Sequence, residues 1–235
     1  MIKDFETTVL NIETVATDTK KLQLTKPSGF NFKAGQFLLI KFAKNLMRAY
    51  SIASSPKDSF LELIIRIIPE GKGSSIIDKT KIGDKFIISG GMGHFLLSEN
   101  KNVELYFLAT GTGIAPFRSM ILTESLQKNP RKMHLFYGGR WKEDLPYLEE
   151  ISEWTKNLEV KIGLSRDLKA HEVYIPNLPQ AKIDNCRITK FIEDENFAEN
   201  SEFYICGNKG MVEGTRDLLF TKGISKERIF FEKFN

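Results

Sequence analysis

The first hundred residues contain short runs in which apolar and polar side chains alternate or apolar side chains dominate. Glycine, proline, asparagine or aspartate separates many of these runs, and these residues favour turns. Such spacing is typical of an antiparallel barrel or sandwich, in which each short strand is followed by a turn. The pattern predicts strands within residues 6–15, 22–26, 35–42, 48–54, 60–68 and 84–90. It also predicts one short helix at 74–79, with Ser74 as its N-cap.

After about Ser98 the pattern changes to buried-type apolar runs that alternate with segments of helical spacing. The apolar runs cover 103–110, 133–139, 158–165 and 202–207. Two intervening segments place their apolar residues mostly on one helical face, namely Ile114, Phe117, Met120, Ile121 and Leu126, and then Val212, Thr215, Leu218 and Leu219. Alternation of strands and helices predicts βαβ units and a parallel sheet, whose ligand site lies beyond the carboxyl ends of the strands.

We therefore expect two domains, an antiparallel β-barrel over 1–98 and an α/β domain over 99–235, with the boundary in the polar segment 97–101. A length of 235 residues suits two compact domains. With 41% hydrophobic and 27% charged residues, the composition is that of a soluble globular protein and excludes extensive disorder.

The net charge of +4 is too small an excess to indicate nucleic acid as a partner. The two cysteines, Cys186 and Cys206, do not form a CxxC pair, and the three histidines are scattered. The sequence therefore predicts no iron–sulfur cluster, zinc site or disulfide framework. Asp4 and Glu6 stand where a signal peptide would be basic and then apolar, so we expect a cytoplasmic protein without a membrane span.

The segment 103–120 is the strongest local signal for ligand binding. An apolar strand runs into Gly111, Thr112 and Gly113 and then directly into a helical pattern. Glycines allow backbone N–H groups to approach a phosphate, and a helix N-terminus adds favourable partial charge. The motif departs from GxGxxG because Pro116 replaces the third glycine, although a proline is well tolerated in the first helical turn. The alternative interpretation is an ordinary glycine turn in a βα unit.

Two further segments could hold an anion and a flat ring. In RAYS, Arg48 and Tyr50 share one face of a strand, while strict alternation sends Ser51 to the other side. In GKGSS, Gly73 and the serines that follow it offer flexible backbone, hydroxyl groups and a helix start. Taken singly, these segments are also compatible with a barrel strand carrying a surface arginine and with a plain hairpin loop.

The order of motifs along the chain is more specific than any one motif. RAYS, GKGSS, GGMGHFLL, GTGIAPF, LFYGGR, SR and YICGNKGM follow one another, and this order resembles the ferredoxin-NADP reductase family, also called the flavodoxin-NADP reductase-like flavoproteins. The resemblance covers nearly the whole chain. It implies a Greek-key-like barrel for FAD, an α/β domain for NADPH or NADH, and hydride transfer between nicotinamide and flavin.

The resemblance also implies roles for individual residues. Arg48 is similar to the arginine that binds the FAD pyrophosphate, Tyr50 to the aromatic against the flavin, and Ser51 to the hydroxyl near its reactive nitrogen. The second pyrophosphate loop would comprise Gly73, Ser74 and Ser75. The nicotinamide dinucleotide would meet the following residues: Gly111, Thr112, Gly113, Pro116, Cys206, Gly207 and Met211.

Two features are less specific. Phe234 and Glu232 are similar to the terminal aromatic and carboxylate of some family members, and the alternative interpretation of Phe234 is a last strand with one apolar anchor. Ser165 and Arg166 match the family's NADP-type SR pair, and Arg187 could add a second charge for a 2′-phosphate. We therefore expect NADPH to be preferred over NADH, with Ser51, Cys206 and Glu232 near the reacting atoms.

The leading functional hypothesis is an FAD-dependent NAD(P)H oxidoreductase that reduces an acidic ferredoxin or flavodoxin. Basic residues of the barrel half would attract that partner, namely Lys41, Lys44, Arg48, Lys79, Lys81 and Lys85. The alternatives within the fold are a free-flavin reductase and the reductase component of an oxygenase. A different class of protein would be a non-autonomous FAD-binding electron-transfer subunit.

Overall fold

The computed structural model describes residues 3–175 and 178–234. Its contacts divide the chain into two units. The first unit comprises the residues up to Leu97 together with Ala115–Thr123, and the second comprises Ser98–Ile114 and the chain from Glu124 onward. The polypeptide therefore passes from the second unit into the first and back again within one helix.

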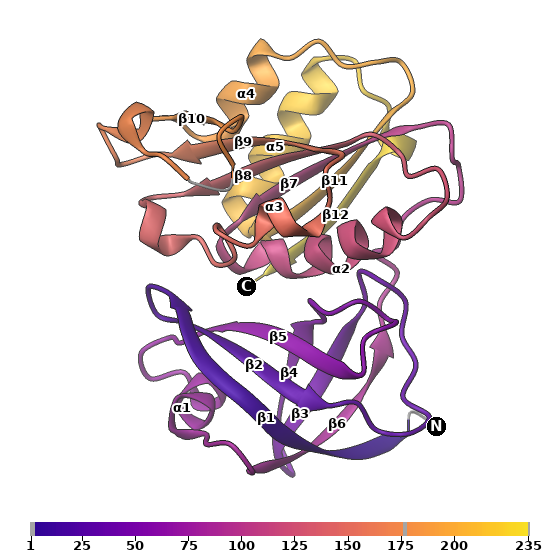
Figure 1. Ribbon diagram of the computed structural model, residues 1–235, viewed down its shortest axis with the longest axis vertical. Coiled ribbons are helices and arrows are strands. Elements are labelled where there is room, and N and C mark those ends of the chain that lie inside the picture. The colour runs from indigo at the N-terminus through magenta and orange to yellow at the C-terminus, as the bar shows by residue number, and fades with distance from the viewer. Residues whose placement is uncertain (1–2, 176–177, 235) are drawn as a thin grey trace. The chain divides into compact units, whose positions relative to one another are not determined.

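The first unit contains a six-stranded antiparallel sheet in the order β4-β3-β6-β1-β2-β5. Its strands are β1 (Asp4–Ala16), β2 (Thr19–Thr25), β3 (Phe37–Ala43), β4 (Leu46–Ser51), β5 (Phe60–Arg66) and β6 (Lys85–Met92). An antiparallel bridge between Ile52 and Leu63 joins the two outer strands and closes the sheet into a barrel (Figure 1). The antiparallel barrel predicted from the alternating pattern is thus confirmed.

The barrel core follows directly from the alternation of side chains along the strands. Leu22 and Leu24 of β2, and Leu38 and Ile40 of β3, are fully buried in one apolar cluster. Residues two apart on a strand face the same side, so these positions point inward together.

Helix α1 (Lys72–Lys79) begins two residues earlier than predicted. Gly71 is its N-cap, and the predicted cap, Ser74, lies inside the first turn. The Ser74 hydroxyl donates to the carbonyls of Ile68 and Gly71, so it secures the preceding loop instead of capping the helix. The N-cap prediction was wrong because glycine at position 71 already supplies the extended backbone that a helix start requires.

The second unit contains a six-stranded parallel sheet in the order β10-β9-β8-β7-β11-β12. Its strands are β7 (Glu104–Thr110), β8 (Met133–Gly139), β9 (Leu158–Leu164), β10 (Lys182–Asp184), β11 (Ser201–Asn208) and β12 (Ile229–Phe234). Its helices are α3 (Ile151–Trp154), α4 (Ile188–Asp194) and α5 (Lys209–Thr221). The parallel sheet predicted for this half is confirmed.

Helices α4 and α5 pack beside each other and against the sheet (Figure 1). The apolar face predicted for the C-terminal helix is correct, because Val212, Thr215 and Leu219 are buried. The prediction for Leu126 was wrong. Helix α2 (Ile114–Ser125) ends before this residue, which is 55% exposed at the helix C-cap.

Helix α2 contributes polar contacts to the barrel unit. Arg118 forms an ion pair with Glu62 at 3.1 Å and donates a hydrogen bond to the Ala53 carbonyl at 3.0 Å. Ser119 donates to the Ser54 carbonyl at 2.7 Å. Glu62 is only 2% exposed, so the guanidinium compensates a buried carboxylate on β5.

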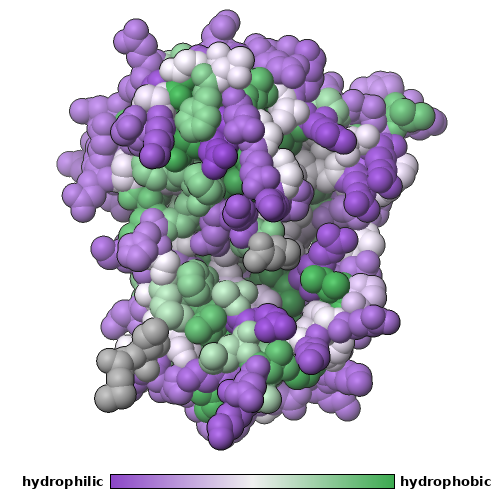
Figure 2. All heavy atoms as spheres, turned by 180° about the vertical axis from the view of Figure 1, so that it is seen from behind, coloured by the Kyte–Doolittle hydropathy of each residue, from purple (hydrophilic) through white to green (hydrophobic). Residues whose placement is uncertain are grey.

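The surface is mainly polar, with patches of apolar side chains on the face shown in Figure 2. No helix in the described ranges is both long and apolar enough to cross a membrane.

Candidate functional site

The barrel brings three predicted site residues together at the start of α1. A Cβ atom on Gly73 would lie 3.0 Å from Cγ of Arg48 and 3.4 Å from the hydroxyl of Tyr50. The same atom would lie 3.2 Å from the ring of Phe42, which was not predicted as a site residue from the sequence. Glycine at position 73 therefore lets α1 approach the side chains of β3 and β4. The two separate motifs RAYS and GKGSS form one cluster.

The cluster combines a cation with aromatic rings. Arg48 is exposed, whereas Tyr50 is half-buried and packs edge-on against Phe42 with ring centroids 6.5 Å apart. Burial raises the pKa of Tyr50 to about 12, and the positive charge of Arg48 partly opposes that effect. Tyr50 is therefore neutral at physiological pH.

The serines of these motifs occupy different environments. Ser51 ends β4 and is buried opposite Phe37 of β3. The Ser74 hydroxyl is used within its own loop, so Ser74 would meet a phosphate through its backbone N–H. Ser75, one residue further along α1, is partly exposed and is the better placed hydroxyl of the pair.

In the second unit, the glycine turn Gly111–Gly113 lies against the end of β11. A Cβ atom on Gly113 would lie 2.2 Å from the carbonyl oxygen of Cys206, which leaves no room for a side chain. Gly111 has a φ of +53° and open space where a Cβ atom would be. Its carbonyl accepts a hydrogen bond of 3.0 Å from the fully buried Tyr137. The turn is therefore fixed by packing against β11 and by a hydrogen bond from Tyr137 of β8.

The Cys206–Gly207 pair near the end of β11 lies close to this glycine turn. A Cβ atom on Gly207 would lie 2.3 Å from Oγ1 of Thr110 and 2.6 Å from Cε of Met211. Asn208 caps α5 by accepting a hydrogen bond from the Met211 backbone N–H. Thr110 and Asn208 were not predicted as site residues from the sequence, although an asparagine directly before a helical pattern is a recognisable N-cap signal.

The predicted thiol and carboxylate lie on adjacent parallel strands. Cys206 of β11 is in register with Glu232 of β12, and Asn208 is in register with Phe234. Burial raises the pKa of the Cys206 thiol well above its ordinary value, and the Glu232 charge acts in the same direction. A neutral buried thiol is a packing group and not a nucleophile.

A third group of predicted site residues lies at the carboxyl ends of β8 and β9. The Ser165 hydroxyl and backbone N–H both donate to the Gly139 carbonyl, and the Arg166 N–H donates to the Arg140 carbonyl. Arg166 and Arg187 are exposed, and a Cβ atom on Gly163 would lie 3.4 Å from the carbonyl carbon of Arg187. Cations thus gather at the carboxyl ends of the strands, where phosphate ligands bind in parallel sheets.

Two residues of the GTGIAP motif group differently from the rest. Ala115 and Pro116 are buried in the first turn of α2 and belong to the barrel unit, whereas the glycine turn and Ile114 belong to the second unit. The predicted residues therefore form one cluster in the barrel and several neighbouring groups around the sheet ends.

The residues of the barrel cluster fit a flavin nucleotide. Glycine at position 73 lets the start of α1 lie in contact with Arg48, Phe42 and Tyr50, so a cation, aromatic rings and the N–H groups of a helix start are close together. Gly113 and Gly207 likewise allow close packing between the glycine turn, the end of β7 and the end of β11.

Comparison with known proteins supports the same assignment. Residues 6–96 match the oxidoreductase FAD-binding domain, and residues 107–217 match the oxidoreductase NAD-binding domain. The crystal structure of a ferredoxin NADP+ reductase from Neisseria gonorrhoeae with bound FAD and NADP matches over 99% of both chains, with a TM-score of 0.85 and 22% identity.

Two curated relatives are similar over 99% of this chain. The reductase component of propane 2-monooxygenase from Rhodococcus jostii is 28% identical, and the present chain spans 64% of its length. A component of the Na(+)-translocating NADH-quinone reductase from Haemophilus ducreyi is 27% identical, and the chain spans 68% of its length.

The antiparallel barrel, the parallel sheet and the two matched domains define an oxidoreductase with an FAD-binding and an NAD-binding domain. The chain therefore combines an oxidoreductase FAD-binding domain with an oxidoreductase NAD-binding domain, and its fold is that of the ferredoxin NADP+ reductase structure.

Proposed function

We infer that this protein transfers a hydride from NADPH or NADH to FAD and passes single electrons to a small acidic redox protein such as a ferredoxin or a flavodoxin. The observation that carries this proposal is the convergence of Arg48, Tyr50 and Gly73 at the start of α1, within a barrel that matches the FAD-binding domain. A bound FAD supplies the conversion between two-electron and one-electron transfer.

On the flavin side, the chain would bind and orient. Arg48 would neutralise the pyrophosphate together with the backbone N–H group of Ser74 and the hydroxyl of Ser75. Tyr50 would lie against the flavin ring, and Ser51 would place its hydroxyl near the reactive nitrogen. Hydride transfer depends on such positioning and on the exclusion of water, and it requires no protein nucleophile.

On the nicotinamide side, the turn Gly111–Gly113 would cradle the dinucleotide phosphates, and the close packing of Cys206 and Gly207 would let the nicotinamide approach the backbone. Glu232 and Phe234 would complete this end of the sheet. Ser165 and Arg166 would bind a 2′-phosphate, which favours NADPH.

The partner proposal rests on the positive charge of the barrel unit. Lys41 and Lys85 form ion pairs with Asp4 and Glu6, each at 2.7 Å, so they add less to the field than their positions in the sequence suggest. The proposal therefore depends on three exposed lysines, which are Lys44, Lys79 and Lys81. Ferredoxin reduction should slow as salt is raised, and a rate independent of salt would contradict this docking mode.

The first test of the function is the visible spectrum of the purified protein and its bleaching by NADPH or NADH under anaerobic conditions. Arg48→Ala should lose flavin while staying folded, and Arg66→Ala, which removes another exposed arginine of the barrel, should retain it. Full flavin retention by Arg48→Ala would show that the pyrophosphate lies elsewhere. Faster bleaching by NADH would contradict the role of Ser165 and Arg166.

A second candidate is the reductase of an oxygenase, because one relative carries that name and aligns with nearly the whole chain. A flavin-loaded protein that oxidises NAD(P)H with a dye but reduces neither ferredoxin nor flavodoxin would favour it. Turnover only with added free flavin would favour a flavin reductase, and no turnover with a dye would favour a subunit that works only when docked. Both cysteines are free, which agrees with a cytoplasmic setting.

A further inference from the structure

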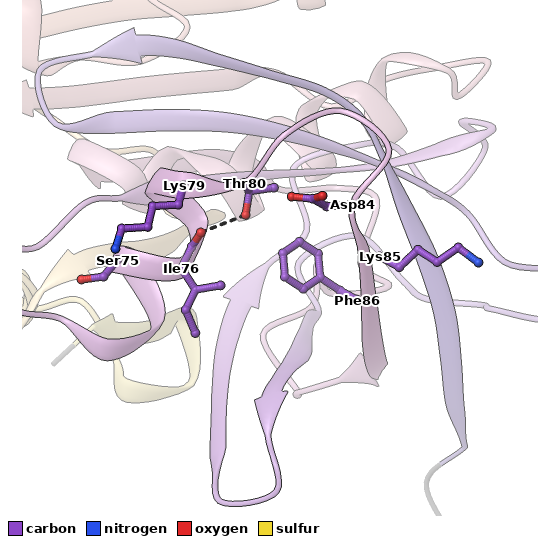
Figure 3. Close-up of a pocket in the computed structure, with 7 residues that line it drawn as sticks. All are labelled: Ser75, Ile76, Lys79, Thr80, Asp84, Lys85 and Phe86. Carbon is purple, nitrogen blue, oxygen red and sulfur yellow. Dashed lines mark hydrogen bonds between the residues drawn. The ribbon is translucent and has the colours of Figure 1, made fainter.

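The candidate phosphate-binding serines of the two units are held in different ways. In the barrel unit, Ser75 lies on helix α1 beside a pocket of about 410 Å³, which Figure 3 shows. The helix fixes the backbone of Ser75, because its N–H donates to the Gly71 carbonyl at 2.8 Å. In the second unit, Ser165 and Arg166 follow the end of β9 and lie outside any helix or strand. Their orientation therefore depends on the groups that pack against them.

The segment after β9 forms a four-residue turn. The Asp167 backbone N–H donates to the Leu164 carbonyl at 3.2 Å, which places Ser165 and Arg166 at the two central positions of the turn. On the β8 side, the Ser165 N–H donates to the Gly139 carbonyl at 3.0 Å. One side of the turn is therefore bound to the neighbouring strand through backbone groups.

The side chain of Asn185, just after β10, binds the turn from the other side. Its amide nitrogen donates to the Leu164 carbonyl at 3.0 Å and to the Asp167 carbonyl at 2.6 Å. Both partners are carbonyl oxygens, so the NH₂ end of the amide faces them. The Asn185 amide therefore spans the first and the last residue of the turn that carries Arg166.

Asn185 also connects this turn to the segment that carries Arg187. That segment packs directly on β9, because a Cβ atom on Gly163 would lie 2.7 Å from the carbonyl oxygen of Cys186. The backbone contact and the two hydrogen bonds of the Asn185 amide together fix how far the backbone of Arg166 lies from that of Arg187.

The position of these arginines matters for a phosphate ligand. The Ser165 hydroxyl donates to the Gly139 carbonyl at 3.1 Å, so the positive charge at this end of the sheet is carried by arginine side chains, among them the exposed Arg166 and Arg187. A guanidinium binds a phosphate through a fixed fork of N–H groups, so its contribution depends on where the backbone places it. A ribose hydroxyl makes no such demand.

We propose that Asn185 is a positioning residue that makes the protein select NADPH over NADH. Its amide holds the turn that carries Arg166 against the segment that carries Arg187, so that both guanidiniums reach one 2′-phosphate. NADH has a hydroxyl group in place of this phosphate and is indifferent to the spacing. The inference rests on the 2′-phosphate site proposed at Arg166.

The test is the steady-state kinetics of dye reduction by the flavin-loaded protein with NADPH and with NADH, together with the dissociation constant of adenosine 2′,5′-bisphosphate measured by calorimetry. Asn185→Ala should raise the KM for NADPH and the dissociation constant about tenfold, the factor expected for the loss of one to two hydrogen bonds. The kcat with NADPH and both constants for NADH should stay unchanged. Asn185 is exposed, so the variant should fold. Asn157→Ala is the matched control, because this exposed asparagine lies at the opposite end of β9.

The outcomes separate the role of Asn185 from the 2′-phosphate site itself. If Arg166→Ala raises the KM for NADPH and Asn185→Ala does not, the positioning role is wrong. An equal rise in the KM for NADPH and NADH in Asn185→Ala would reduce the residue to a general structural role and would also overturn the proposal. If Arg166→Ala leaves the KM for NADPH unchanged, the 2′-phosphate lies elsewhere and both assignments fall.

Discussion

The buried ion pair between Arg131 and Glu124 offers a quantitative test of what holds the second unit together. The two side chains are 2% and 3% exposed, with Nη2 of Arg131 2.6 Å from Oε2 of Glu124 and Nε 3.0 Å from Oε1. Arg131 also donates to the carbonyls of Ser98 and Asn100. Arg131 thus connects the segment that follows α2 to residues 98–100, where the second unit begins.

Arg131→Met keeps the length of the side chain but leaves a carboxylate buried without its cation. Removing one partner of such a pair costs about 3–5 kcal/mol, a large part of the roughly 5–15 kcal/mol that stabilises a typical domain. With a urea dependence of about 2 kcal/mol per molar, the unfolding midpoint should fall by about 1.5–2.5 M. Both tryptophans, Trp141 and Trp154, lie in this unit, so their fluorescence reports its unfolding.

Lys101→Met is the matched control, because the Lys101 ammonium lies 3.6 Å from the same carboxylate but the side chain is 57% exposed. An exposed pair contributes about 0–1 kcal/mol. A midpoint shift for Arg131→Met that is no larger than the shift for Lys101→Met would refute the reasoning.

The pH dependence supplies a second readout. Burial alone would raise the pKa of Glu124, but the hydrogen bonds and charge of Arg131 outweigh burial and hold this pKa below its ordinary value of 4.5. In the unaltered protein, the stabilisation by the Glu124–Arg131 pair should be fully present above pH 4.5 and should be lost as the pH falls through the lowered pKa of Glu124. In Arg131→Met, the hydrogen bonds and charge of Arg131 are absent, so burial raises the pKa of Glu124. The variant should therefore gain stability on acidification from neutral pH, and the difference in unfolding free energy between the variant and the unaltered protein should become smaller.

Three further outcomes follow from the geometry. Gly113→Ala should destabilise the second unit by about 2–4 kcal/mol in urea unfolding, because its Cβ atom would lie 2.2 Å from the Cys206 carbonyl oxygen; an unchanged midpoint would contradict this close approach. Gly214→Ala, inside α5 with open space around the added atom, should stabilise by about 0.5–1 kcal/mol, and a loss of stability would show a hidden clash. A water-soluble aromatic disulfide reagent should modify Cys206 only after denaturation, since burial keeps its thiol neutral and inaccessible; modification of Cys206 as fast as the partly exposed Cys186 in the native protein would contradict its burial.

The sequence predicted most of the sheet architecture because strands carry their signal locally. The alternation of apolar and polar residues predicted that Leu38 and Ile40 face the inside of the barrel. The continuous apolar run 103–110 predicted a strand that is buried on both faces. Each inference needed only neighbours a few residues apart.

The missed features depend on partners distant in sequence. Ser74 had the composition of a cap, but its hydroxyl is drawn to Ile68, six residues earlier. The role of Phe42 emerges only when Gly73, thirty-one positions away, is brought against it. The Arg118–Glu62 pair links a helix of the nucleotide half of the sequence to a barrel strand, and nothing in the spacing of either segment indicates it.

That pair also bears on how this chain can be recombined. Because Arg118 and Ser119 of α2 make polar contacts with β5 and the segment before it, a fragment cut near residue 97 would carry Glu62 without its guanidinium and the carbonyls of Ala53 and Ser54 without their donors. A chimera that exchanges the nicotinamide half for that of a relative must therefore keep Ala115–Thr123 with the barrel or replace Glu62 at the same time. The modules that can be inherited or engineered separately here are defined by contacts and are not two continuous stretches of sequence.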